Sequence, residues 1–340
     1  MSTPVAERLA AQLLSGPPAT GVADVVDRLL AVQAQDLRAA RLAMRARSTG
    51  LLAGDVDRAL DDGSHVVSWL NRGTLHLVST EDHWWLQELT TPTQRSNSDR
   101  RLGQEGVDPD AAERGVRAVR AALADGPRTR AELREVVAAA DVPVARQALV
   151  HVLFRTSLDG YLTRGPVVGG EQLFVATEHL GPRPRLPERE VLLAELARRY
   201  LVGHGPADAA DLARWAGIRL TEARTGLRGV RRLVERPDGL VDLPGRPPPP
   251  PLPAPRLLGG FEPLLLGWVS REDVLAGHTT LVTTNGLFRP FALAGGRAVA
   301  TWGLPRGRVT VTPLGEGDLA PDVAGALDRD AREVERFLAG

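Results

Sequence analysis

Two glutamines separated by one alanine, Gln33-Ala34-Gln35, are the residues of this sequence whose types and spacing best suit chemistry. Apolar residues recur at helical spacing from Val22 to Leu30, and the same spacing predicts that position 33 faces the core. A carboxamide buried there without partners would cost roughly 1–3 kcal/mol. On an ideal helix the two side chains would lie about 200° apart, so they can face one pocket only if the helix ends or distorts. The structural alternative is a capped helix end with two solvated amides.

Composition excludes several other kinds of catalytic centre. The chain has no Cys and no Lys, so all 42 basic residues are Arg, and it offers neither a thiolate nor a side-chain amine for a Schiff base. Unless the terminal amine intervenes, chemistry at a sugar carbon would have to use water. The seven histidines lack the spacing of metal ligands, so we predict no metal site. The sequence has no Walker loop, Rossmann fingerprint or nucleophile elbow, and we predict no cofactor.

The net charge is zero, so contacts with an anionic polymer would have to come from local groups of arginines. One candidate is the turn Arg72-Gly73-Thr74, where Gly73 allows a close approach and Arg72 can reach a phosphate, with His76 following in the next strand. The alternative is an ordinary strand whose buried histidine is satisfied by the backbone.

Two further groups have the composition of phosphate-contacting segments. Residues 93–101 combine Arg95, Arg100 and Arg101 with Ser, Thr and Asn, and the alternative for them is a solvated helix. The turn at Asn285, followed by Arg289, can enter a groove as a wing, and its alternative is plain hairpin chemistry.

The elements that would position these residues repeat along the chain. Gly126-Pro-Arg-Thr-Arg-Ala-Glu-Leu133 recurs as Gly205-Pro-Ala-Asp-Ala-Ala-Asp-Leu212, and each copy opens a helix that a second helix and a hairpin follow. In the first copy this second helix is predicted over 143–156. Two helices and two strands between residues 37 and 79 give the same order. Helix, helix, hairpin is the plan of a winged helix-turn-helix.

The remainder of the sequence, from residue 246 onward, differs in composition from the repeated units. A proline-rich stretch over 246–255 predicts an extended hinge. Turn signals then predict strands and a closing amphipathic helix, over 279–284, 287–293, 297–302, 308–312 and 319–338. We therefore predict an α+β fold that is mainly α. Its expected parts are three tandem winged-helix units, the first with the glutamine motif, and a β-rich C-terminal part: residues 1–105, 106–187, 188–246 and 247–340.

From about residue 20 to 315 the sequence resembles the AlkZ/YcaQ-type family of winged-helix DNA glycosylases. The stretches that carry the resemblance are Leu30-Ala-Val-Gln-Ala-Gln-Asp36, Trp69-Leu-Asn-Arg-Gly-Thr-Leu-His76, Gly205-Pro-Ala, Arg214-Trp-Ala-Gly217, Leu258-Gly-Gly-Phe-Glu-Pro-Leu-Leu-Leu-Gly267, Asn285-Gly-Leu-Phe-Arg-Pro290 and Thr301-Trp302. The resemblance implies a concave DNA-binding surface formed by the three winged helices. It also implies that Gln33 and Gln35 are catalytic, since the family's motif is Gln, an apolar residue, then Gln or Asp.

The activity that the resemblance implies is hydrolysis of the N-glycosidic bond of an alkylated base, and the absence of lysine predicts no lyase activity. A purine alkylated at N7 or N3 is already cationic and leaves without protonation, so the enzyme needs an oriented water and a dipole near C1′. Neutral carboxamides can supply both. We assign Gln35 to the water and Gln33 to orienting that water or the sugar phosphate. Bulky or crosslinked adducts are expected substrates, in repair or in self-protection against a genotoxin. Where relatives often carry Asp, this chain has Glu262, for which we expect a structural role.

Two alternatives remain at this point. A non-catalytic DNA-binding protein, acting as a regulator or lesion sequestrant, would keep its function in Gln33→Ala and Gln35→Ala variants. An interaction protein that binds no DNA would lack the steep salt dependence of phosphate contacts. The expected partner is double-stranded DNA that contains alkylated bases. No apolar run approaches the roughly 20 residues that span a bilayer, and the first residues do not resemble a signal peptide. We therefore expect a cytoplasmic, nucleoid-associated monomer.

Overall fold

The computed structural model describes residues 4–283 and 286–340. The chain forms two compact units. The split unit is assembled from Met1–Val56, Glu190–Trp215 and Arg219–Gly340, and the middle unit from Asp57–Arg189 and Ala216–Ile218. Both units combine helices with antiparallel strands, so the predicted α+β class is confirmed.

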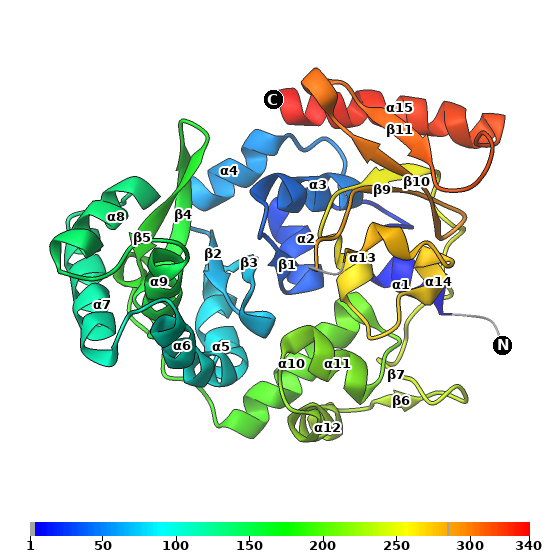
Figure 1. Ribbon diagram of the computed structural model, residues 1–340. Coiled ribbons are helices and arrows are strands. Elements are labelled where there is room, and N and C mark those ends of the chain that lie inside the picture. Colours follow the sequence, from blue (N-terminus) through cyan, green and yellow to red (C-terminus); the bar gives the residue numbers. More distant parts are fainter. Residues whose placement is uncertain (1–3, 284–285) are drawn as a thin grey trace. The chain divides into compact units, whose positions relative to one another are not determined.

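The middle unit consists of an antiparallel sheet and the helices around it. Its elements are α4 (Ala53–Asp61), which begins in the split unit, β2 (His65–Trp69), η1 (Asn71–Gly73), β3 (Leu75–Ser79), α5 (Thr80–Thr90), α6 (Pro92–Gln104), α7 (Pro109–Ala124), α8 (Arg130–Ala139), α9 (Ala148–Leu158), β4 (Leu162–Val168), β5 (Glu171–Ala176) and η2 (Thr177–Leu180). Its strands lie in the order β3-β2-β4-β5 (Figure 1). Helix α9 packs against β2, β4, α6 and α7, so it forms the centre of this unit.

The split unit carries the first and last parts of the sequence. Its elements are α1 (Val5–Ala11), α2 (Val22–Leu29), β1 (Val32–Gln33), α3 (Leu37–Arg47), α10 (Arg189–His204), α11 (Ala209–Ala216), α12 (Leu220–Gly229), β6 (Val234–Glu235), β7 (Val241–Asp242), β8 (Arg256–Leu258), α13 (Pro263–Leu266), α14 (Glu272–Leu275), η3 (Thr279–Leu281), β9 (Phe291–Ala294), β10 (Arg297–Gly303), η4 (Pro305–Gly307), β11 (Thr310–Pro313) and α15 (Pro321–Ala339).

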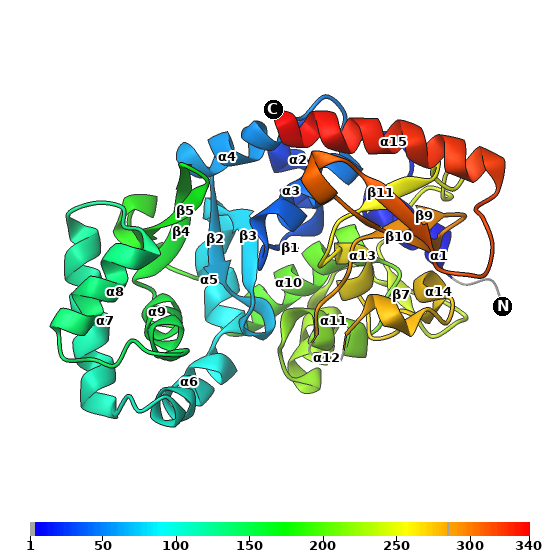
Figure 2. The same ribbon diagram turned by 45° about the horizontal axis from the view of Figure 1, so that its top comes forward.

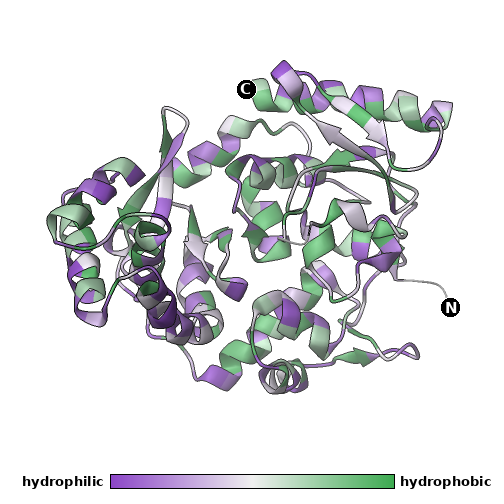
Figure 3. Ribbon diagram, in the orientation of Figure 1, coloured by the Kyte–Doolittle hydropathy of each residue, from purple (hydrophilic) through white to green (hydrophobic). Residues whose placement is uncertain are grey.

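A hydrophobic core in the split unit joins residues from both ends of the sequence. Strands lie in the order β11-β10-β9-β8, and α15 runs beside them (Figure 2). Along α15, hydrophobic and hydrophilic residues alternate, as a helix with one buried face requires (Figure 3). The buried side chains of this core come from α3, the start of α4, the sheet and α15: Leu42, Ala53, Leu257, Ala292, Ala300, Trp302, Leu327, Val334 and Phe337.

Several helices begin at residues whose side chains satisfy the free N–H groups of the first turn. Asp36 caps α3, and Asp108 caps α7 immediately before Pro109. Thr129 and Glu132 form a reciprocal capping box at the start of α8. These are the residue types that helix starts favour, which explains why the sequence locates these helices well.

The main predictions about element order are confirmed. The apolar stripe from Val22 to Leu30 is buried on α2 and its first following residue. Along the described residues the order helix, helix, hairpin occurs as α3-α4-β2-β3, as α8-α9-β4-β5 and as α11-α12-β6-β7. The tandem of winged-helix units and its boundaries stay a prediction. None of the helices within the described residues is both long and apolar enough to cross a membrane.

One predicted strand is wrong, and one predicted helix begins later than expected. The strand expected over 279–284 begins as the 3-10 turn η3, because the N–H of Val282 donates to the carbonyl of Thr279 at 3.1 Å and closes a turn. The β-branched threonines favour extended backbone, but this local bond prevails. The helix expected over 143–156 begins only at Ala148, since Arg146 has a φ of 52° that no α-helix accommodates.

Candidate active site

The Gln33-Ala34-Gln35 motif lies between α2 and α3, where the backbone leaves helical geometry. Helix α2 ends at Leu29, and Leu30 has a positive φ of 66°. The N–H of Leu30 still donates to the carbonyl of Val26 at 2.7 Å, so this residue closes the helix. Val32 and Gln33 are then extended as β1. The helix therefore ends before the motif, which is the condition under which its two glutamines can act together.

The two glutamines differ in their access to solvent. Gln33 is 7% exposed and Ala34 is 1% exposed, whereas Gln35 is exposed. The separation of about 200° predicted for an ideal helix does not apply, since the chain is extended at Gln33 and bends at Gln35. The motif thus presents one buried glutamine and one that is exposed to solvent.

Helix α3 fixes the chain directly after the motif. The Asp36 carboxylate accepts hydrogen bonds from the N–H of Arg38 at 2.9 Å and of Ala39 at 3.4 Å. Asp36 is the acidic residue nearest in sequence to the glutamines, and its carboxylate therefore caps α3. The glutamines themselves are neutral, with oxygens that accept and NH2 groups that donate. Such groups can orient a water molecule without taking its proton. Among the described residues, no three His, Asp or Glu side chains gather as metal ligands.

The predicted DNA contact at Arg72 lies in the middle unit, at the tight turn between β2 and β3. Arg72 has a φ of 57°, and Gly73 has a φ of 74°. The hydroxyl of Thr74 donates to the carbonyl of Asn71 at 3.1 Å, which closes the turn. A Cβ atom at Gly217 would lie 2.6 Å from the Arg72 nitrogen, so only glycine allows this close approach. Arg72 itself is half-buried.

His76 is the second residue of β3, after that turn, and is 2% exposed. Its Nδ1 is 2.9 Å from the carbonyl of Thr74. Burial, with the neighbouring Arg72 guanidinium, lowers the pKa of His76 to about 3, so the ring is neutral at pH 7. This arrangement matches the alternative to a DNA contact that the sequence left open: a buried histidine in an ordinary strand, whose ring forms its hydrogen bond with the backbone. The ring therefore supports the turn from inside.

The arginines predicted on residues 93–101 are exposed on α6 but do not share one face. Ser98 and Leu102 form the buried side of this helix. At about 100° per residue, Arg100 points away from that side, and Arg101 lies about 100° further round. Arg95 lies close to the buried side, where its Nη2 is 3.0 Å from the Asp159 carboxylate. Of the three, Arg100 is the best placed to meet a partner.

The predicted wing at Asn285 and Arg289 is described only in part. Asn285 lies outside the described residues. Arg289 is exposed, and its N–H donates to the carbonyl of Leu281 at 2.9 Å. Val282 and Phe288 form an isolated bridge across the segment. These two backbone contacts therefore fix the segment that carries Arg289.

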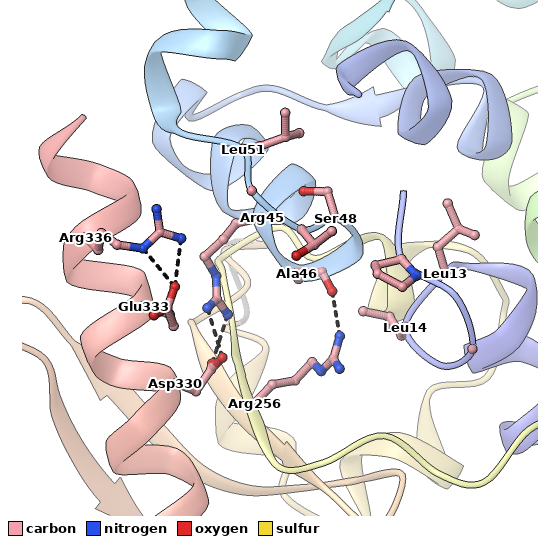
Figure 4. Close-up of a pocket in the computed structure, with 14 residues that line it drawn as sticks. Leu13, Leu14, Arg45, Ala46, Ser48, Leu51, Arg256, Asp330, Glu333 and Arg336 are labelled. Carbon is pink, nitrogen blue, oxygen red and sulfur yellow. Dashed lines mark hydrogen bonds and ion pairs between the residues drawn. The ribbon is translucent and has the colours of Figure 1, made fainter. Parts of the chain in front are cut away.

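The charged pocket of about 340 Å³ in the split unit contains none of the predicted site residues (Figure 4). Both terminal nitrogens of Arg45 donate to the Asp330 carboxylate, each at 2.9 Å. Arg336 pairs with Glu333 at 2.7 Å. Arg256 donates to the carbonyl of Ala46 at 2.6 Å. These charged groups are engaged within the protein, and the contacts of Arg45 and Arg256 tie α15 and β8 to α3.

Glu262 has the structural role that the sequence suggested. Its side chain is fully buried and pairs with the equally buried Arg47, which also donates to the Gln12 amide oxygen at 2.7 Å. The same carboxylate accepts from the N–H of Leu264 and so caps α13. Glu262 therefore holds the C-terminal part of the split unit against α3.

Sequence reasoning overlooked the residues that hold the motif in place. Asp36 carried a usable signal, because an Asp directly before an apolar helix is a common cap. Leu30 carried none, since leucine favours helices and rarely adopts a positive φ.

Comparison with known proteins gives concordant results. Residues 26–337 match the family described as DNA glycosylase AlkZ-like. An interstrand DNA cross-link repair glycosylase from Streptomyces sahachiroi is 26% identical over 356 residues, which cover 97% of this chain and 94% of that protein. The solved structure of Streptomyces sahachiroi DNA glycosylase AlkZ superimposes with a TM-score of 0.81 at 26% identity, covering 98% of this chain and 95% of that one.

Proposed function

The chain belongs to the AlkZ-like DNA glycosylase family, and we propose that it hydrolyses the N-glycosidic bond of cationic, N7- or N3-alkylated purines in double-stranded DNA. The relative from Streptomyces sahachiroi is named for interstrand cross-link repair, which supports bulky and crosslinked adducts as substrates of this chain. The observation that carries the proposal is the Gln33-Ala34-Gln35 motif, held at the end of α2 with one glutamine exposed.

In the proposed reaction the C1′–N bond breaks and the alkylated base departs with the bonding electron pair as a neutral molecule. The sugar becomes cationic at C1′, and water adds there and releases one proton to the solvent. The exposed Gln35 accepts a hydrogen bond from that water and directs its oxygen at C1′. The buried Gln33 orients the same water or the sugar phosphate. The dipoles of the two amide oxygens also stabilise the developing positive charge. No acid is needed, because the base already carries its positive charge in the ground state.

We assign the chain to hydrolysis without a lyase step. A lyase would need an amine that attacks C1′ and forms a Schiff base. The sequence has no lysine, so its side chains offer no such amine. The abasic site would therefore remain intact after the base is released.

DNA binding is proposed to use the three tandem winged-helix units in a monomer, located in the cytoplasm with the nucleoid. Its contacts are assigned to the turn between β2 and β3, to α6, and to the segment before β9: Arg72, Thr74, His76, Arg95, Arg100, Arg101, Asn285 and Arg289. Within this set His76 acts through the turn that it supports, because its ring is buried.

The test is base release from a duplex that contains a single N7-methylguanine. After incubation with excess protein, heating in alkali should cleave the strand at the abasic site, and omission of alkali should leave it intact. Gln35→Ala should lower the single-turnover rate constant by about 100-fold or more, the usual size of the loss of a positioned catalytic group. Gln147→Ala removes an exposed amide elsewhere and should leave the rate unchanged.

Each other outcome has a definite meaning. Release at the full rate by both Gln33→Ala and Gln35→Ala would disprove the assignment of the motif. Cleavage without alkali would disprove the absence of a lyase step. Failure to release N7-methylguanine calls for the same measurement on a duplex with a crosslinked adduct. Failure on both substrates, with binding retained, would identify a non-catalytic DNA-binding protein.

A further inference from the structure

Helix α10 packs against the last turn of α2 with no space for a side chain between them. A Cβ atom at Gly203 would lie 2.2 Å from the carbonyl oxygen of Arg28 and 3.2 Å from the Cα of Leu29. The first distance is far below any tolerated contact, and the atom it meets belongs to the backbone. Only glycine at position 203 therefore permits the observed distance between the two helices.

A second contact lies one helical turn earlier on the same face of α10. The Nη2 of Arg199 donates to the carbonyl of Asp27 at 3.3 Å and is 3.9 Å from the Asp27 carboxylate. Residues four apart share a helix face, so Arg199 and Gly203 act together. They meet Asp27 and Arg28, whose carbonyls belong to the last turn of α2.

The chain has little freedom between this turn and the glutamine motif. Leu30 has a φ of 66° and is fully buried, and Ala31 and Val32 are 4% and 0% exposed. Gln33 follows directly. A displacement of the end of α2 would therefore be transmitted along buried backbone to the motif, because close-packed interiors do not absorb such shifts locally.

We propose that Gly203 and Arg199 are positioning residues for the reaction, which set the place of Gln33 and Gln35 through the end of α2. The inference rests on the proposed function, since it requires those glutamines to be catalytic. Gly203 and Arg199 touch neither the water nor the DNA in this scheme. Their effect is on the rate of the chemical step and not on affinity for the substrate.

The test is the single-turnover rate of base release by Gly203→Ala, measured together with the protein concentration that half-saturates lesion-containing DNA. The rate constant should fall by about tenfold to 100-fold, because misplacement of a catalytic group by about 1 Å has effects of this size. The half-saturating concentration should stay within about twofold of that of the native protein, which corresponds to about 0.4 kcal/mol.

Gly226→Ala is the matched control. Gly226 lies on α12 and also faces α10, where a Cβ would lie 2.5 Å from the carbonyl oxygen of Leu193. Leu193 is ten residues from Gly203 on α10, or about 15 Å along the helix. The control should therefore destabilise the same unit by a similar backbone clash, and its rate of base release below the unfolding transition should be unchanged.

Arg199→Gln provides a second variant, in case Gly203→Ala does not fold. It breaks an ion pair whose partner Asp27 is exposed, although Arg199 itself is only 18% exposed, and it should lower the rate constant by about three- to tenfold while the melting temperature changes little. Equal losses of rate in Gly203→Ala and Gly226→Ala, or a full rate in Arg199→Gln, would show that α10 is merely structural. Full rates in Gln33→Ala and Gln35→Ala would instead reject the assignment of the glutamine motif, on which this inference rests.

Discussion

His76, His83 and His204 are buried histidines whose pKa values are lowered chiefly by loss of water, to about 3, about 4 and about 3. Positive neighbours act in the same direction: Arg72 beside His76 and Arg183 near His83. In the unfolded chain the same rings would have the ordinary pKa of about 6.5. The native protein therefore keeps three imidazoles uncharged that the unfolded chain would protonate in mild acid.

We expect this to make the protein sensitive to acid. Between about pH 6.5 and pH 4 the unfolded state binds protons that the native state cannot, so the free energy of unfolding falls as the pH falls. Each histidine contributes about 1.4 kcal/mol per pH unit in that window and nothing further above it. Urea unfolding at pH 7.5, 6.5 and 5.5 would measure the slope.

His83→Gln should reduce the slope of the free energy of unfolding against pH by the contribution of one histidine. Glutamine keeps a polar group near the Ser68 hydroxyl, which lies 3.2 Å from the Nε2 of His83, but it cannot be protonated. His179→Gln is the control, because His179 is exposed and remains in water in both states. An unchanged slope in His83→Gln would mean that other groups, such as carboxylates, cause the acid sensitivity.

At the level of elements, the start of α3 should matter for catalysis as well as for stability. Asp36→Ala removes the cap and should lower the free energy of unfolding by about 1 kcal/mol, while Asp36→Asn should retain most of it. Because Gln35 directly precedes Asp36, loss of the cap should also slow base release several-fold. Single-turnover kinetics well below the melting temperature would measure this.

Asp108→Ala is the matched control for that experiment. Asp108 caps α7 by accepting from the N–H of Ala111 at 2.8 Å, so its loss should cost a similar free energy. It lies in the middle unit, outside the motif. Equal slowing of base release by Asp36→Ala and Asp108→Ala would attribute the effect to general destabilisation.

The elements that the sequence predicts well are those with local signals. The stripe on α2, the start of α8 and the turn between β2 and β3 each depend on residues within a few positions of one another. The spacing of the stripe also drew attention to Gln33. The end of α2 at Leu30 was not predictable, because leucine favours the helix that stops there.

The arrangement of the site depends on contacts between distant residues, which periodicity does not report. The approach of Gly203 to Arg28 joins positions far apart in the chain. Arg100 and Arg101 are neighbours in sequence, yet α6 turns them about 100° apart. The adjacency of these arginines in the sequence therefore suggested a single basic patch. On α6 they instead form separate charges that point in different directions.

For the whole molecule, equal numbers of basic and acidic residues mean that DNA binding cannot come from overall charge. The logarithm of the binding constant should fall linearly with the logarithm of salt concentration, with a slope set by the few arginines that meet phosphates. Arg100→Ala should reduce that slope by about one unit, since each lost phosphate contact has this effect. Fluorescence anisotropy between about 50 and 200 mM salt would measure it.

Arg336→Ala is the comparison variant, because that arginine is exposed but pairs with Glu333 at 2.7 Å. It should leave the slope unchanged. The reverse result, with an effect of Arg336→Ala and none of Arg100→Ala, would exclude α6 from the DNA-binding surface and point to the end of α15.

The composition of the split unit also determines the order in which the protein can fold on the ribosome. Nearly all of the middle unit lies within Asp57–Arg189 and has emerged long before the chain is finished. The core of the split unit needs Leu42 together with Leu327, Val334 and Phe337, so it cannot close until α15 has been made. Domains whose sequence emerges first generally fold first. The segment that bears the glutamines is thus translated early, but it belongs to the unit whose core closes only after α15 has been translated.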